Sequence, residues 1–225
     1  VNRNIQVGGN TGFGEKHITN PEDGSFTLAE EPMTLSLIKY ASQNELPLGF
    51  ISFHTYPGMG KENNPRAIIM DDYNLLMGIL KGWLEQYQFK DTIIMDDEWG
   101  IIPNGKAEFL SHEFGSSFVG TKLLDMEKAD LPLQSFAGIM NDFFGSCQED
   151  RWEGGGNPFT CENIIKPNFN AFKAFTELSG SKIELKGGND YVKAAASRDS
   201  DKVSVVLSNF QNPRAAAQQS ANYLK

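Results

Sequence analysis

Residues 93–100 read Ile-Ile-Met-Asp-Asp-Glu-Trp-Gly, an apolar run that stops at three carboxylates and a tryptophan. Strands of a parallel barrel are buried on both faces and read as apolar runs, and catalytic groups sit at their C-terminal ends. The pattern therefore predicts Glu98 as a nucleophilic or acid/base carboxylate, with Trp99 as a flat apolar surface for a ligand. Side-chain alternation predicts that Asp96 points the same way as Glu98 and that Asp97 points the opposite way. The alternative is a strand that ends in a solvated acidic loop.

Four apolar segments with helical patterns between them indicate a parallel sheet and the α/β class. The segments are Asn4–Val7, Phe50–Tyr56, Thr92–Glu98 and Ser135–Asp142. Helical spacing of apolar residues predicts helices from Pro32, Ile69, Phe114 and Lys166 onward. Four such units cannot close an eight-unit (β/α)8 barrel. The chain is therefore either an open doubly wound sheet or half of a barrel.

The periodicity changes after the fourth predicted helix. Segments 190–197 and 202–210 alternate or run β-branched on either side of a polar turn, which predicts an antiparallel hairpin. We therefore expect two domains, an α/β domain of one of these two kinds over residues 1–183 and a β-rich module over residues 184–225.

Composition narrows the class of partner. The formal net charge is −9 and no basic stripe is present, so a nucleic-acid partner is not expected. No run of 18 apolar residues occurs, so no membrane span is expected. The two cysteines, Cys147 and Cys161, are either free or joined in a disulfide. Neither has a second Cys or His at ligand spacing, so no metal site is expected.

Polar and aromatic residues also follow the other predicted strands. His54 and Tyr56 share one face of their strand and can hold a carboxylate or a sugar hydroxyl. Asn10 follows two glycines, which permit either a close approach to a ligand or a simple turn. Trp152 lies in a Gly-rich loop and can stack on a pyranose, or it can pack that loop against the rim of the sheet. A core histidine is the alternative for His54.

In order and spacing, these motifs resemble glycoside hydrolase family 39, which includes β-xylosidases and α-L-iduronidases. The similarity rests on Gly8-Gly9, residues 50–56 (Phe-Ile-Ser-Phe-His-Thr-Tyr), Glu98-Trp99 and Lys166-Pro167. It implies the C-terminal half of a (β/α)8 TIM barrel, strands five to eight, followed at residues 191–210 by strands of an accessory β-sandwich. It also implies a retaining mechanism with Glu98 as the nucleophile.

The resemblance further implies a glycoside, oligosaccharide or polysaccharide substrate, an extracellular or secreted protein, and no cofactor. It makes His54 and Tyr56 sixth-strand pocket residues. The sequence departs from the family pattern in three places. The family's acid/base glutamate follows an asparagine at a strand end, but Asn44-Glu45 lies at the end of a predicted helix. Gly49 stands where the family commonly has Asp, and Asp97 stands where it often has Thr.

The missing acid/base is therefore expected upstream of Val1, in an N-terminal barrel half on the same chain or on a separate one. Two alternatives remain open. The first is a carbohydrate-binding protein on a degenerate glycosidase barrel, without catalysis. The second is an unrelated open α/β domain whose acidic cluster binds a cation or a partner.

Overall fold

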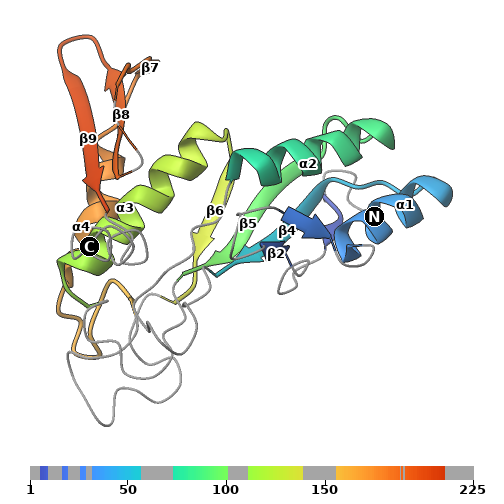
Figure 1. The fold of residues 1–225 in the computed structure, drawn as a ribbon, viewed down its shortest axis with the longest axis horizontal. Coiled ribbons are helices and arrows are strands. Elements are labelled where there is room, and N and C mark those ends of the chain that lie inside the picture. Colours follow the sequence, from blue (N-terminus) through green and yellow to red (C-terminus); the bar gives the residue numbers. More distant parts are fainter. Residues whose placement is uncertain are drawn as a thin grey trace, which may run out of the picture. The chain divides into compact units, whose positions relative to one another are not determined.

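The computed structural model describes residues 6–9, 17–19, 26–28, 32–56, 73–100, 111–138, 156–187, 189 and 191–210. Contacts divide the chain into two compact units. The first unit comprises residues 1–55, 72–99 and 127–136. The second unit comprises residues 56–71, 100–126 and 137–225. Figure 1 labels most of the elements of both units.

The first unit contains a four-stranded sheet in the order β1-β4-β5-β6, with every neighbouring pair parallel (Figure 1). Its strands are β1 (Gly8–Gly9), β4 (Phe50–Thr55), β5 (Ile93–Trp99) and β6 (Leu133–Phe136). Parallel strands require crossover connections, and helices α1 (Met33–Gln43) and α2 (Tyr73–Gln86) lie in the first two. The predicted α/β class with a parallel sheet is therefore confirmed.

Two glycines form the whole of β1, which begins just after the segment predicted as a strand, Asn4–Val7. A Cβ added to Gly8 would lie 2.1 Å from the carbonyl oxygen of Phe50, whereas one added to Gly9 would lie 4.0 Å from its nearest neighbour, Leu37. Gly8 is therefore required for the close approach of β1 to β4. The sequence left open a simple turn or a close approach to a ligand for these glycines, whereas the structure shows a close approach of Gly8 to a neighbouring strand.

Two further differences from the predicted strands concern short elements. Strands β2 (His17–Thr19) and β3 (Phe26–Leu28) form an antiparallel pair that the sequence did not predict. Strand β6 starts at Leu133, two residues before the prediction, and residues 139–142 of the predicted strand lie outside the described residues. Segments of three or four residues are too short to show a clear period in sequence.

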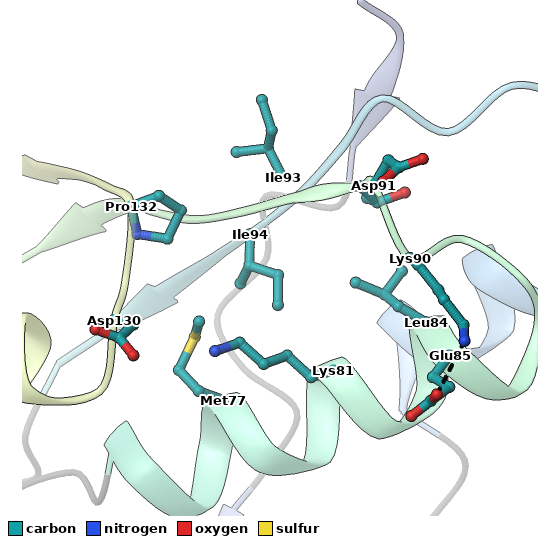
Figure 2. A pocket seen from close by; sticks show the side chains of 11 residues that line it. Met77, Lys81, Leu84, Glu85, Lys90, Asp91, Ile93, Ile94, Asp130 and Pro132 are labelled. Atoms are coloured by element: carbon teal, nitrogen blue, oxygen red, sulfur yellow. Dashed lines mark ion pairs between the residues drawn. The ribbon is translucent and has the colours of Figure 1, made fainter.

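Helix α2 packs one apolar stripe against the sheet. The buried residues of this stripe are Tyr73, Leu76, Met77, Leu80 and Leu84. Figure 2 shows the side chain of Ile94 on β5 pointing toward α2, and that of Ile93 pointing to the opposite face. A cavity of about 480 Å³ lies here, lined in part by Met77, Leu84 and Ile94. It lies at the N-terminal end of β5, the end of a barrel strand that serves stability.

The face of the sheet opposite α2 exposes apolar side chains. Met95 and Leu133 are register partners, so Leu133 shares a face with Met95 and with Ile93 two residues earlier. Ile93 is 38% exposed and Leu133 is 49% exposed. Parallel sheets are normally covered on both faces. Within the described part of the chain, this face therefore has an incomplete cover.

The second unit combines helices with an antiparallel sheet. Its helices are most of α3 (Glu113–Lys128) and α4 (Pro167–Thr176), and its sheet consists of β7 (Ser181–Ile183), β8 (Val192–Arg198) and β9 (Val203–Asn209). The predicted hairpin is confirmed as β8–β9, and β7 adds a third strand. The Phe210 ring packs against Phe114 and Phe118 of α3, with centroids 5.1 and 5.8 Å apart. The proposed domain boundary after residue 183 stays a prediction.

Candidate active site

One residue of β5 has no counterpart on either neighbouring strand. Along β4, Phe53 pairs with Asp96 and His54 pairs with Glu98. Along β6, Gln134 pairs with Asp96 and Phe136 pairs with Trp99. The step from the first pair to the second is two residues on β6 but three residues on β5. Both ladders therefore count one surplus residue between Asp96 and Trp99, and the β4 ladder identifies it as Asp97. This is a β-bulge, an irregularity that is common beside active sites and re-aims side chains.

The bulge changes which acidic residues share a face. Asp96 shares a face with its partner Phe53, and Glu98 shares the opposite face with its partner His54. The predicted common direction of Asp96 and Glu98 is therefore wrong. Strict alternation was assumed through a strand that contains an extra residue, and a single insertion exchanges the faces of everything that follows.

His54 lies beside two carboxylates at the C-terminal ends of β4 and β5. Its Nε2 atom is 3.5 Å from Oδ1 of Asp97 and 3.7 Å from Oε2 of Glu98. The exposed fraction of the side chain is 12% for His54, 20% for Asp97 and 39% for Glu98. The structure thus brings together His54 and Glu98, two of the predicted site residues. Glu98 is the more open carboxylate, and His54 can orient it.

Asp97 is the residue of this group that the sequence did not single out. It was expected on the far face, and the bulge brings it to the imidazole of His54. The acidic run was visible in the sequence, but the position of the surplus residue was not. A ligand that reaches Glu98 would therefore meet a pair of carboxylates and an imidazole.

On the opposite face, Asp96 is fully buried in a polar cluster. Its Oδ2 atom accepts hydrogen bonds from the hydroxyl of Thr55, the last residue of β4, and from the hydroxyl of Tyr73, the first residue of α2, the latter at 2.8 Å. The two hydroxyl oxygens are 2.6 Å apart. This cluster joins the ends of two strands to the start of a helix, directly behind the candidate site.

Trp99 does not offer its ring to a ligand, because it is fully buried. Its indole Nε1–H donates to Oε1 of Gln134, and its ring meets Phe136 edge to face with centroids 4.8 Å apart. The bulge explains this position, since Trp99 follows the surplus residue and faces the same side as Asp96. Its expected role as a sugar platform beside Glu98 therefore needs correction, and Trp99 anchors the end of β5 instead.

Three further residues were predicted for the site, namely Tyr56, Asn10 and Trp152. Tyr56 follows β4 directly, is partly buried and belongs to the second unit. Asn10 and Trp152 lie outside the described residues. Cys161 is disulfide-bonded, and the other cysteine of the chain, Cys147, lies outside them too.

Two kinds of feature were searched for in the described ranges. No cluster of three or more His, Cys, Asp or Glu side chains in those ranges could hold a metal ion. None of the helices described is both long enough and apolar enough to cross a membrane.

Comparison with known proteins places this geometry in context. No protein-family model matches the chain. A β-xylosidase from Caldicellulosiruptor saccharolyticus is 23% identical over 183 residues, which cover 77% of this chain and 37% of that protein. This chain therefore spans little more than a third of the length of that relative.

Solved structures show the same fold. The GH39 enzyme from Xanthomonas axonopodis pv. citri matches with a TM-score of 0.62 at 19% identity, covering 79% of this chain and 36% of its own. A GH39 β-xylosidase from Caulobacter crescentus matches with a TM-score of 0.57 at 18% identity, covering 76% and 34%. A GH86 protein solved in complex with neoagarooctaose matches with a TM-score of 0.52 at 12% identity, covering 77% and 30%.

The parallel sheet of this chain, with helices between its strands, and the chain's similarity to these solved structures agree with the resemblance to glycoside hydrolase family 39 seen in the sequence. The chain has a GH39 β-xylosidase-like fold in the form of a partial barrel, and it is a distant relative of glycoside hydrolases.

Proposed function

We propose that this chain supplies the nucleophile side of a retaining glycoside hydrolase. The observation that carries the proposal is the position of Glu98. It lies at the C-terminal end of a parallel strand, keeps 39% of its side chain exposed, and has the imidazole of His54 at 3.7 Å. Catalytic groups of barrel enzymes come from these strand ends, and the relatives are glycosidases.

In the proposed reaction, a carboxylate oxygen of Glu98 attacks the anomeric carbon and the glycosidic bond breaks. A second carboxylic acid protonates the leaving oxygen. The covalent glycosyl-enzyme is then hydrolysed by water, which the second carboxylate deprotonates. Retention requires the two carboxyl groups to be about 5–5.5 Å apart. His54 would hold Glu98 in the orientation needed for attack.

The second carboxylic acid is proposed to come from outside these 225 residues. The Asn-Glu pair of this chain, Asn44-Glu45, follows α1, where Asn44 is the helix C-cap and Glu45 has a φ of 52°. This is a helix end, whereas a barrel's catalytic acid sits at a strand end. The chain alone is therefore expected not to turn over glycosides whose leaving group needs protonation.

The exposed sheet face supports the same proposal. Ile93 and Leu133 would contact the remaining βα units of a barrel, on the same polypeptide or a separate one. Ile93→Ser with Leu133→Ser should lower the free energy of unfolding of the isolated chain by only about 2 kcal/mol, because both side chains are already part-exposed, and it should reduce the binding of a hydrophobic dye. A large loss of stability would show that this face is already covered.

The decisive test uses a reagent whose leaving group departs without an acid. A 2,4-dinitrophenyl 2-deoxy-2-fluoro-β-xyloside should label Glu98 covalently, and peptide mass spectrometry would locate the label. The sugar is chosen because a relative is a β-xylosidase. Glu98→Gln should abolish labelling, and Glu45→Gln should not. A label on another carboxylate would remove Glu98 from the nucleophile role.

One observation favours a second candidate, a carbohydrate-binding protein without catalysis. The Nε2 atom of His54 is 3.5 Å from Asp97 and 3.7 Å from Glu98, so Asp97 can compete with Glu98 for the imidazole. If the chain is such a binding protein, calorimetry would detect its binding of a β-xyloside without the fluorine, and the fluorinated reagent would form no covalent bond with it. The GH86 match shows that a protein of this fold holds an oligosaccharide.

A further inference from the structure

The cluster of Thr55, Tyr73 and Asp96 has an unusual place in the fold. Asp96 is the last residue of β5 before the surplus residue, and its side chain faces away from the proposed active site. All three side chains are almost completely buried, with exposed fractions of 4%, 1% and 0%. They come from β4, α2 and β5, so the cluster ties three elements together at one point.

A buried carboxylate in this position is costly unless it is well bonded. An apolar residue would fill the same space without that cost, and the rest of β5's buried face is apolar or aromatic, as Ile94 and Trp99 show. Asp96 instead accepts hydrogen bonds from two hydroxyl groups on separate elements. Hydrogen bonds to a carboxylate are directional and short, so they fix a strand more closely than apolar packing does.

The need for such fixing follows from the bulge. The surplus residue interrupts the ladders on both sides of β5, and a bulged residue lacks regular ladder pairing. The β4 ladder resumes with Glu98 opposite His54, and side-chain contacts on either side of the bulge can hold that register in place. Asp96 stands immediately before the bulge and Trp99 stands two residues after it. Each is anchored on the helix-side face, Asp96 by hydroxyl groups and Trp99 by Gln134 and Phe136.

We propose that Thr55, Tyr73 and Asp96 act as positioning residues, which clamp the bulge from behind and thereby hold Glu98 against His54. The effect on catalysis rests on the proposed function, but the effect on geometry does not. The cluster would set the direction of the carboxylate, and none of its members would touch the sugar.

The geometric part is tested by NMR on the isolated chain. The chain has three histidines, so the ring resonances of His54 are assigned by their loss in His54→Gln. Tyr73→Phe removes one donor and keeps the ring, and it should shift these resonances. Tyr40→Phe is the matched control on α1, where Tyr40 is 58% exposed, and it should not. Unshifted His54 resonances in a folded Tyr73→Phe chain would overturn the proposal.

The catalytic part uses the fluorinated xyloside on the same variants. Thr55→Val should lower the maximal rate of labelling about tenfold, since small misplacements of a reacting group cost that much or more. The reagent concentration for half-maximal labelling should stay unchanged, and Thr55→Ser should restore the rate because it keeps the hydroxyl. A loss that Thr55→Ser fails to restore would overturn the positioning role.

The two proposals fail in distinguishable ways. If the wild-type chain is not labelled while Tyr73→Phe still shifts the His54 resonances, the nucleophile assignment is wrong and the clamp stands. If the wild type is labelled at Glu98 and neither the resonances nor the rate respond to the cluster variants, the clamp is wrong and the nucleophile assignment stands.

Discussion

Two helical glycines are expected to respond to alanine in opposite directions. In a helix interior, alanine is favoured over glycine by about 1 kcal/mol, because glycine loses more backbone entropy on folding. No described atom lies within 4 Å of a Cβ added to Gly82 on α2. Gly82→Ala should therefore raise the free energy of unfolding by about 1 kcal/mol.

At Gly120 on α3, alanine has the same advantage in helix propensity, but there is no free space for its Cβ atom. An added Cβ would lie 3.2 Å from Oγ and 3.4 Å from Cβ of Ser208 on β9. Ser208 is not free to turn away, because its hydroxyl donates to the carbonyl of Ser117 at 2.9 Å and therefore accepts from Thr121 at 2.8 Å. Overpacking costs about 1–3 kcal/mol, and each weakened hydrogen bond costs about 1 kcal/mol. With one or two bonds weakened, these costs exceed the gain, so Gly120→Ala should lower the free energy of unfolding by about 1–4 kcal/mol.

Urea unfolding followed by circular dichroism measures both changes. A double-mutant cycle with Ser208→Ala isolates the crowding, since contacting residues couple by about 0.5–3 kcal/mol. Gly120→Ala should cost less in the Ser208→Ala background, where the Oγ atom is gone. The reasoning is refuted if Gly120→Ala stabilises the chain as Gly82→Ala does, or if its cost is the same in both backgrounds.

Three further predictions follow from single positions. Gly8→Ala should destabilise the chain by about 3 kcal/mol in urea unfolding, because its Cβ would meet the Phe50 carbonyl oxygen at 2.1 Å, and the adjacent control Gly9→Ala should not. Burial lowers the pKa of Lys166 from 10.5 to about 8. Between pH 8 and pH 10.5 the unfolded chain therefore binds more protons than the folded chain, so the free energy of unfolding should rise with pH across this window. The rise should be about 3 kcal/mol larger in the wild type than in Lys166→Met, which lacks the titrating group. Deleting Asp97 should keep the following glutamate beside the same histidine, and an unchanged labelling site for the fluorinated xyloside would check this.

Local patterns predicted the framework well. The apolar runs ending at Tyr56 and Glu98 became the two central strands, β4 and β5, and the 3.6-residue spacing in α2 matched its buried stripe. These features are legible because strand and helix periods repeat over six or more residues. The two-residue strand β1, the β2–β3 pair and β7 were not legible, because so short a segment carries no period.

The candidate site was predicted only in part. His54 and Glu98 meet as their strand-end positions suggested, since parallel neighbours bring their C-terminal ends to one edge. The roles of Asp97, Thr55 and Tyr73 were missed. Asp97 requires knowledge of the bulge, and the other two side chains meet Asp96 only after β4, β5 and α2 have packed.

The sequence by itself determined that a cluster of carboxylates ends a buried strand of a parallel α/β fold, because burial and alternation are local properties of the chain. Only the tertiary structure decided which face each carboxylate takes. That choice depends on register, and β5 acquires its surplus residue by pairing with β4 and β6, which are distant in the sequence. The same pairing buries the side chain of Trp99 and leaves that of Glu98 partly exposed.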